Sequence, residues 1–132
     1  MQNDYQGDLL ERNIAFRFDG VICRGSGEWK GVASIPDNPA EGIRDLFKKL
    51  RSAGFVVTVC TERAASLAGR NAVIAWLSKH HLIEFVSEVT NSVPICKCLV
   101  DDKAICFTDV QGLFWKIVNF DAYREGLQNE ER

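Results

Sequence analysis

Four polar residues in this chain stand directly after short apolar runs, where a strand would deliver them to the edge of a sheet. They are Asp19 after residues 13–18, Thr61 after residues 56–60, and the pair Asp101 and Asp102 after residues 98–100. Runs of this length predict buried strands, and in an open α/β sheet the carboxyl ends of the strands form the edge where ligands bind. Carboxylates at such an edge can serve as general acid or base, or as oxygen ligands of Mg²⁺.

The first of these segments carries a resemblance to a known family. Residues Arg17 to Ile22 read Arg-Phe-Asp-Gly-Val-Ile and resemble the first motif of the haloacid dehalogenase superfamily, Asp-x-Asp-Gly-Val/Thr. Later segments resemble further motifs of that family in the same order: Thr61-Glu62-Arg63 compared with Ser-x-Arg, Trp76-Leu77 with Trp-Leu, and Val100 to Ala104 with Ile-Asp-Asp-Arg-Ala. The likeness spans most of residues 13–107 and is closest to small phage and bacterial members. It implies an α/β, three-layer Rossmann-like domain with a mainly parallel central sheet.

Two departures from the family's pattern remove reactive groups. In the resembled family the first Asp of the motif attacks phosphorus, the second acts as general acid and base, and a Lys neutralises the intermediate. Arg17 stands at the nucleophile position, and Val93 stands where the family's Lys-Pro-x-Ala pattern has its Lys. Lys97 is nearby, but its spacing from Asp101 is wrong for that role. Without an oxygen nucleophile no aspartyl-phosphate forms, so the resemblance implies a pseudoenzyme in which Asp19 keeps a vestigial acid/base position.

The other family positions complete the predicted site. Those expected to bind phosphate or another ligand are Thr61, Arg63 and Gly20, and those at metal positions are Asp101 and Asp102. Because Arg17 subtracts a carboxylate and adds a cation, we expect it to pair with Asp101, Asp102 or Asp19 in place of Mg²⁺. No cofactor is therefore expected, and Mg²⁺ would be required only if the chain retained turnover.

Each site residue also has an ordinary structural interpretation. Asp19 before Gly20 suits a turn, and Thr61 can cap the helix that follows it. A charged loop residue such as Arg63 is more often solvated than bound to a ligand. His80 and His81 fall at a predicted helix end, where the dipole favours partial positive charge, and are interpreted as structural.

The elements that must position these groups follow from apolar periodicity. Helices are predicted from Asn38-Pro39, through a stripe ending at Leu50, and from about Ala65 to His80. The segment from Leu113 to Tyr123 is predicted to be a closing helix or an ordered tail. Further short strands are predicted at residues 85–89, 98–100 and 105–107. Val21 to Pro36, rich in glycine and carrying Trp29, predicts a short flap with no room for a cap domain. Trp76 and Trp115 lie in apolar patterns and are predicted to be in the core.

Bulk properties limit the organisation and the partners. At 132 residues the chain suits a single domain at residues 13–123, with a flexible arm at 1–12 and a charged tail at 124–132. A formal net charge of -2 gives no basic field for nucleic acid, and no apolar stretch approaches the roughly 20 residues of a membrane span. A cytoplasmic protein is expected, whose five cysteines are reduced core thiols.

The sequence therefore predicts a capless domain that resembles haloacid dehalogenases but acts as a non-catalytic binding or regulatory module. Its expected partner is a small anionic or phosphorylated ligand, or a protein that contacts the flap around Trp29, with no role for nucleic acid or membrane. The alternative is a phosphohydrolase with an unorthodox active site that uses Asp19 or Asp101. A receiver-like signalling domain is disfavoured because its acidic pair would follow the first strand, whereas the pair here follows the fourth.

Overall fold

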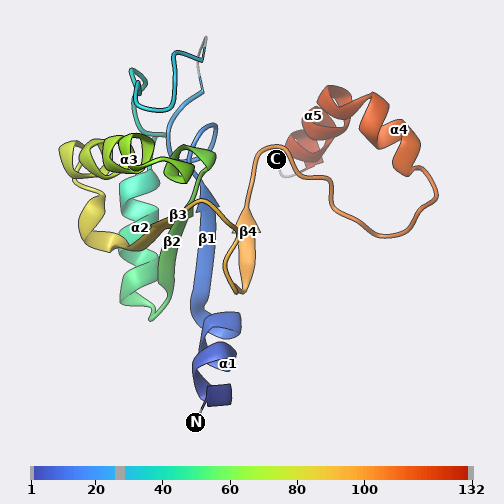
Figure 1. Cartoon of the computed structure of the whole chain (residues 1–132). Helices are drawn as coiled ribbons and strands as arrows, with labels where there is room; N and C mark the ends of the chain where they lie inside the picture. The colour runs from blue at the N-terminus through green and yellow to red at the C-terminus, as the bar shows by residue number, and fades with distance from the viewer. Residues whose placement is uncertain (1, 26–28, 131–132) are drawn as a thin grey trace. The chain divides into compact units, whose positions relative to one another are not determined.

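A computed structural model describes residues 2–25 and 29–130 of the chain (Figure 1). These residues form two compact units, one ending at Asp102 and the other beginning at Lys103. Residues 26–28 of the predicted flap lie outside the described part of the chain. Among the described residues, no helix has the combination of length and hydropathy that a membrane crossing requires.

The first unit is built on a parallel sheet of four strands. These are β1 (Asn13–Arg17), β2 (Val56–Cys60), β3 (Val86–Thr90) and β4 (Cys98–Val100), arranged in the order β3-β2-β1-β4. In register, Ile14 of β1 faces Val57 of β2 and Cys98 of β4, all in parallel pairing. The predicted α/β fold with a parallel sheet is confirmed at this level, and its topology is consistent with a Rossmann-like fold.

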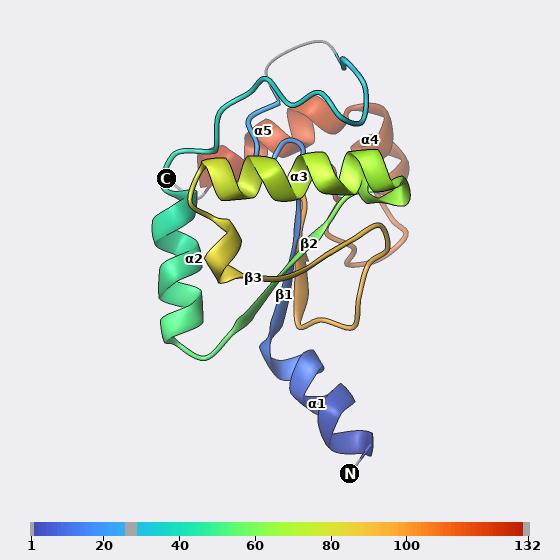
Figure 2. The same cartoon turned by 60° about the vertical axis from the view of Figure 1, so that its left-hand side comes forward.

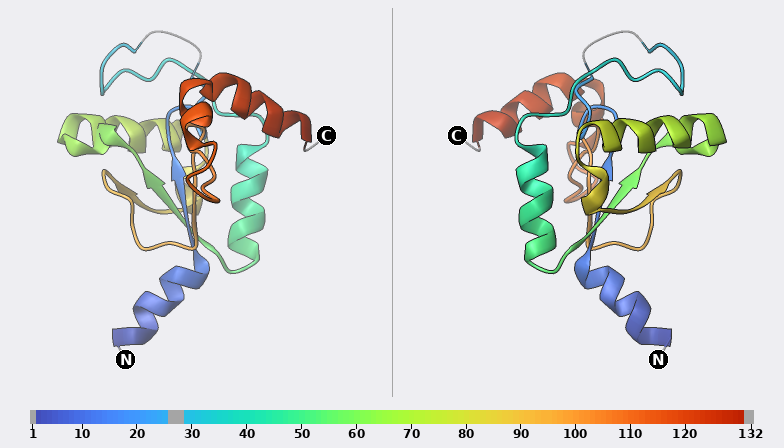
Figure 3. Two further views of the ribbon diagram at one scale, coloured as in Figure 1. Left: turned by 90° about the vertical axis from the view of Figure 1, so that its right-hand side faces the viewer. Right: turned by 90° about the vertical axis from the view of Figure 1, so that its left-hand side faces the viewer.

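The apolar core lies on the face of the sheet covered by two helices, α2 (Ile43–Ser52) and α3 (Leu67–Lys79) (Figure 2). Phe16 of β1 meets Phe47 of α2 with ring centroids 5.0 Å apart, and Phe18 meets Trp76 of α3 at 4.9 Å. Figure 3 shows α2 running along the strands while α3 crosses them. Trp76 is buried, as predicted. These edge-to-face contacts fix the end of β1, from which the site residues emerge.

The opposite face of the sheet contains two buried polar side chains, Asn13 on β1 and Thr58 on β2. Successive side chains of a strand point to opposite faces, so Asn13 lies on the face opposite to that of Ile14. Its Oδ1 accepts a 2.7 Å hydrogen bond from the hydroxyl of Thr58 on β2. The Asn13 amide also donates to the carbonyl of Ile95, at 2.8 Å, in the segment between β3 and β4. The side chains of Asn13 and Thr58 are both buried, and these hydrogen bonds satisfy their polar atoms.

Several elements differ from their predicted bounds. Residues Gln2–Arg12, predicted to form an arm, are helical (α1), and Figure 1 shows α1 extending beyond the amino end of β1. Helix α2 begins at Ile43 and not at Asn38, because Ala40 donates its amide to the carbonyl of Ile22 and Pro39 forms a bridge with Cys23. A tertiary contact thus overrides a strong local start signal.

The segment after β2 also begins differently. A 3-10 turn, η1 (Glu62–Ala65), precedes α3, and Ser66 caps α3 by accepting from the amide of Gly69. A second turn, η2 (Ile83–Phe85), precedes β3, which starts one residue later than predicted.

The second unit contains α4 (Leu113–Val118) and α5 (Phe120–Glu130). The single closing helix is therefore broken at Asn119. The strand predicted at residues 105–107 was wrong, because those residues have no regular secondary structure, and Cys106 donates its amide to the Tyr123 hydroxyl at 3.0 Å. The prediction that Trp115 is a core residue was also wrong, since 54% of it is exposed.

Candidate functional site

The predicted site residues of the first unit gather at one edge of the sheet. Because all four strands are parallel, their carboxyl ends meet there, with Asp19 after β1, Thr61 after β2 and Asp101 after β4. The strand order changes direction between β1 and β4, and such a switch point is where open α/β sheets bind their ligands. The sequence was therefore informative about which residues share this edge.

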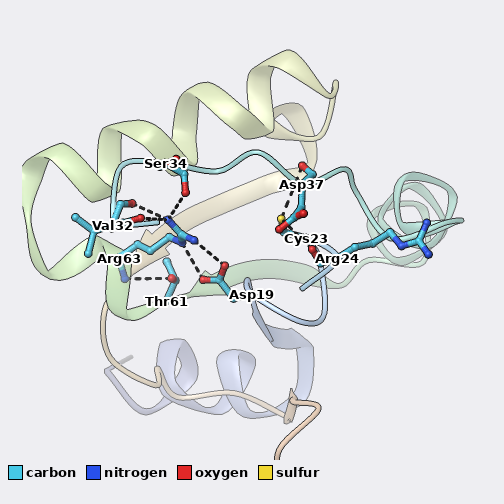
Figure 4. A network of polar contacts seen from close by, with 9 residues as sticks. Asp19, Cys23, Arg24, Val32, Ser34, Asp37, Thr61 and Arg63 are labelled. Carbon is cyan, nitrogen blue, oxygen red and sulfur yellow. Dashed lines mark hydrogen bonds and ion pairs between the residues drawn. The ribbon is translucent and has the colours of Figure 1, made fainter. Parts of the chain in front are cut away.

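The strongest polar contact at the edge joins Arg63 to Asp19 (Figure 4). The Arg63 Nε donates to Asp19 Oδ2 at 2.8 Å, and its Nη2 donates to Oδ1 at 2.9 Å. Only 5% of the Arg63 side chain is exposed, against 44% of the Asp19 side chain. A paired fork of this kind is among the stronger and more directional hydrogen-bond arrangements in proteins.

The other terminal nitrogen of Arg63 fastens residues 29–34, which we call the strap. Nη1 donates to the carbonyls of Gly31, Val32 and Ser34 at 3.0, 2.8 and 3.2 Å. The ring of Trp29 lies against the guanidinium, 4.3 Å from Cζ to the ring centroid, although 60% of that residue is exposed. Arg63 therefore connects the strap, the Asp19 turn and the end of β2, as Figure 4 shows for the labelled residues.

Arg63 is itself held by the backbone around it. Thr61 caps η1 by accepting a 3.2 Å hydrogen bond from the Arg63 amide, and its own amide donates to the carbonyl of Thr90. A Cβ atom on Gly69 would overlap the Arg63 carbonyl oxygen. Gly69 allows α3 to approach this turn closely, so packing requires a glycine here although glycine is unfavourable inside a helix.

Gly20 serves a similar purpose beside Asp102. Gly20 has φ +88°, and a Cβ there would lie 2.5 Å from Asp102 Oδ2. The turn after Asp19 therefore needs glycine both for its backbone conformation and for the close approach of this carboxylate. Of the three predicted ligand residues, Gly20 thus contacts Asp102, while Thr61 and Arg63 are engaged with other parts of the chain.

Arg17 pairs with Asp101, as the sequence suggested, but loosely. The Arg17 Nε lies 3.7 Å from Asp101 Oδ2, and Nη1 donates to the Cys60 sulfur at 3.3 Å. At 3.7 Å, the contact between Arg17 and Asp101 is an ion pair that is too long for a hydrogen bond. Asp19, one of the three carboxylates proposed for Arg17, binds Arg63 instead.

Two buried thiols lie among these charges. Burial raises the pKa of Cys60, an effect that Arg17 opposes and that Asp101 and Glu62 reinforce. Burial also raises the pKa of Cys23 to about 11, helped by the charges of Asp19 and Asp37 and opposed by Arg63. Both sulfurs are therefore protonated near neutral pH and are poor nucleophiles.

The cysteine prediction holds in part. All five thiols are free, but only Cys23 and Cys60 are buried, while Cys98 and Cys106 are exposed.

The carboxylates at this edge do not fit a divalent metal. The Asp19 oxygens accept from Arg63 and Asp101 lies beside Arg17, so each faces a guanidinium. Among the described residues, no three His, Cys, Asp or Glu side chains gather in a way that could hold a metal ion. Magnesium requires several oxygen ligands around one centre, and a neighbouring guanidinium opposes it by charge.

The remaining predicted positions lie elsewhere in the first unit. Val93 is 51% exposed and carries no charge. His80 packs on the Trp76 ring with centroids 4.5 Å apart, and burial lowers its pKa, reinforced by Lys79 and His81. His80 thus has a structural contact, and its surroundings oppose the positive charge that its place at a helix end suggested.

Sequence reasoning missed the importance of Arg63. It was interpreted as a solvated loop residue or as a ligand contact, whereas it is buried and bound to the chain's own carboxylate and carbonyls. The nearest signal in the sequence was the similarity of Thr61-Glu62-Arg63 to a family motif. Comparisons with models of protein families, with curated proteins and with solved structures found no match to this chain.

Proposed function

We propose that this chain is a capless haloacid-dehalogenase-like domain that has lost its catalytic groups and acts as a non-catalytic binding or regulatory module. The sheet order supports the proposal, because β1 lies between β2 and β4 and brings Arg17, Asp19, Thr61 and Asp101 to one edge. These are the positions that carry the motifs of the resembled family.

The observation that carries the proposal is the Asp19–Arg63 fork. Both carboxylate oxygens accept from one guanidinium, at 2.8 and 2.9 Å. A general acid or base needs an oxygen within hydrogen-bond reach of the reacting group, and these two oxygens are directed at Arg63. Asp19 acts here as the counterion of Arg63.

The other reactive positions support the same function. Arg17 offers no oxygen to attack phosphorus, and Val93 offers no charge to neutralise an intermediate. The charge of Asp101 is compensated by Arg17 at 3.7 Å, which makes a bound metal unnecessary. We propose that the edge binds a small anionic or phosphorylated ligand without turning it over, with a protein contact around the exposed Trp29 as the other mode of use.

The test is hydrolysis of p-nitrophenyl phosphate with and without Mg²⁺. We expect no release of phosphate by the natural chain. The double variant Arg17→Asp with Val93→Lys restores the two missing groups, and the single variant Arg17→Asp is its control. Turnover by the double variant would support the proposal that this domain has lost its catalytic groups.

The outcome that contradicts the proposal is phosphate release by the natural chain that disappears in Asp19→Asn. That result would establish the alternative, a phosphohydrolase with an unorthodox active site. The activity would have to scale with the folded fraction and persist after a second purification step, so that a contaminating phosphatase is excluded.

A further inference from the structure

We infer that Arg63 is an oxyanion receptor whose binding position is filled by Asp19, and that a phosphate-bearing ligand binds by displacing this carboxylate. The contact is therefore autoinhibitory. The inference rests on the proposed function, because it names the ligand class and the gate of the same site. It is carried by the geometry of Arg63, by the difference in exposure between its two sides, and by its place at the sheet edge.

The Arg63 fork already has the geometry that an oxyanion needs. Nε and Nη2 point at two oxygens of one group, at 2.8 and 2.9 Å. A guanidinium presents the same pair of donors to a carboxylate and to a phosphate, because both offer two oxygens at similar spacing. Asp19 thus occupies the position that a ligand's phosphate would take.

The fork stays in place when Asp19 leaves, because other contacts hold the guanidinium. Nη1 donates to Gly31, Val32 and Ser34, and the Trp29 ring lies 4.3 Å from Cζ. The Arg63 amide is fixed by the Thr61 hydroxyl oxygen. A receptor held by its surroundings loses little conformational entropy on binding, which favours a specific ligand.

Solvent reaches this pair from the side of Asp19. The Asp19 side chain is far more exposed than that of Arg63, so an incoming anion meets the carboxylate first. Asp19 lies beyond the end of β1 and precedes Gly20, whose positive φ makes a sharp turn. A carboxylate in such a turn can rotate into water, and an ion pair whose carboxylate is 44% exposed holds it less tightly than a fully buried pair would.

Nearby negative charge determines in which direction the affinity for an anion should change when Asp19 is neutralised. Asp102 lies against Gly20, so an anion that enters while Asp19 keeps its charge meets two carboxylates. Neutralising Asp19 removes both the competitor and part of the repulsion. If Asp19 fills the fork at least nine-tenths of the time, freeing the fork raises the apparent affinity about tenfold or more.

The experiment uses inorganic phosphate as the probe, with the full chain and a constant ionic strength set by chloride. Binding is measured by titration calorimetry and by the Arg Nε–H resonances in nitrogen-edited NMR spectra. We expect Asp19→Asn to bind phosphate at least about tenfold more tightly than the natural chain, and Asp19→Asn with Arg63→Met to lose that gain. Asp45→Asn, on the exposed side of α2, removes the same charge elsewhere and should leave affinity unchanged.

Equal phosphate affinity in folded Asp19→Asn and in the natural chain would overturn the inference, as would a gain that survives Arg63→Met. If Asp19→Asn is unfolded in chloride, phosphate should restore its folding transition, because a ligand that binds only the native state stabilises it. Failure of phosphate to do so would also overturn the inference. The hydrolysis assay is independent of these titrations, so a failed receptor and a retained catalytic activity give different results.

Discussion

Asp19 and Arg63 are separated by 44 residues in sequence, yet they meet through two hydrogen bonds of nearly equal length, 2.8 and 2.9 Å. Strands β1 and β2 are neighbours in the sheet, and the pairing of Asp19 with Arg63 joins the end of β1 to the turn after β2. The same guanidinium then reaches the strap through Nη1. One side chain therefore connects three segments that are distant in the sequence.

Removal of this side chain should destabilise the first unit strongly. Arg63→Met keeps much of the apolar stem but deletes five hydrogen bonds, to Asp19 and to the three strap carbonyls. Breaking a fully buried pair costs about 3–5 kcal/mol, and because Asp19 is partly solvated we expect a loss of about 2–4 kcal/mol by urea denaturation. Arg44→Met is the control. Its ion pair with Glu84, at 3.3 Å, is exposed on both sides, so its loss should stay below about 1 kcal/mol. Similar losses for the two variants would refute the special role of Arg63.

Arg17 should contribute less than Arg63 but more than a surface charge. Its 3.7 Å contact with Asp101 is long and partly exposed, so Arg17→Ala should lower the free energy of unfolding by about 1 kcal/mol. A double-mutant cycle with Asp101→Asn isolates the pair from the packing of the stem, and a coupling of about 0.5 kcal/mol is expected. No coupling, together with a loss within about half a kcal/mol for Arg17→Ala, would show that the guanidinium does not compensate this carboxylate.

Gly69→Ala should destabilise the protein although alanine is the better helix former. The new Cβ would overlap the Arg63 carbonyl oxygen, and overpacking of this kind costs about 1–3 kcal/mol. Gly7→Ala in α1 is the matched control, because nothing lies within 4 Å of its Cβ position. There the substitution should be neutral or stabilise by up to about 1 kcal/mol. A lower urea midpoint for Gly69→Ala and an equal or higher midpoint for Gly7→Ala are the expected results. A stabilising Gly69→Ala would mean that α3 does not approach the turn so closely.

Cys23 should make stability fall at high pH. Its pKa rises from 9.0 to about 11 on folding, mainly through burial. The folded state thus holds the proton more tightly than the unfolded state, so this contribution is complete below pH 9 and is lost as the pH rises from about 9 to about 11. A shift of two units corresponds to about 2–3 kcal/mol, and Cys23→Ala should abolish that part of the decline. Denaturation curves at pH 8 and pH 11 measure it. An equal decline in both proteins would show that other groups cause it.

The sequence was most informative about the sheet. Apolar runs of strand length predicted β2 and β4, and β4 has its predicted bounds. The parallel arrangement and the polar residues at strand ends then followed from the general behaviour of α/β sheets. These features depend on local composition, which a sequence displays directly.

The contacts that complete the site depend on tertiary structure and were not predicted. The helix start predicted at Asn38-Pro39 was wrong, because Ala40 donates its amide to the carbonyl of Ile22, and α2 begins at Ile43. The need for glycine at position 69 could not be predicted, because nothing in the sequence places the Arg63 carbonyl beside it. Arg63 looked solvated because its acceptors lie about 30 to 44 residues away.

The strap consists of six residues outside any helix or strand, and its fastening comes from one arginine on another part of the chain. The conformation of the strap therefore depends on a residue that is distant in the sequence. Trp29, whose ring lies against the guanidinium, and Gly31, whose φ is +110°, are tied to their residue types. The other strap residues can change with little effect on how the segment is held, since Arg63 donates to backbone carbonyls, which every amino acid supplies. Sequence drift in this stretch would alter what the molecule presents to its surroundings while the anchoring persists, provided that position 63 remains arginine.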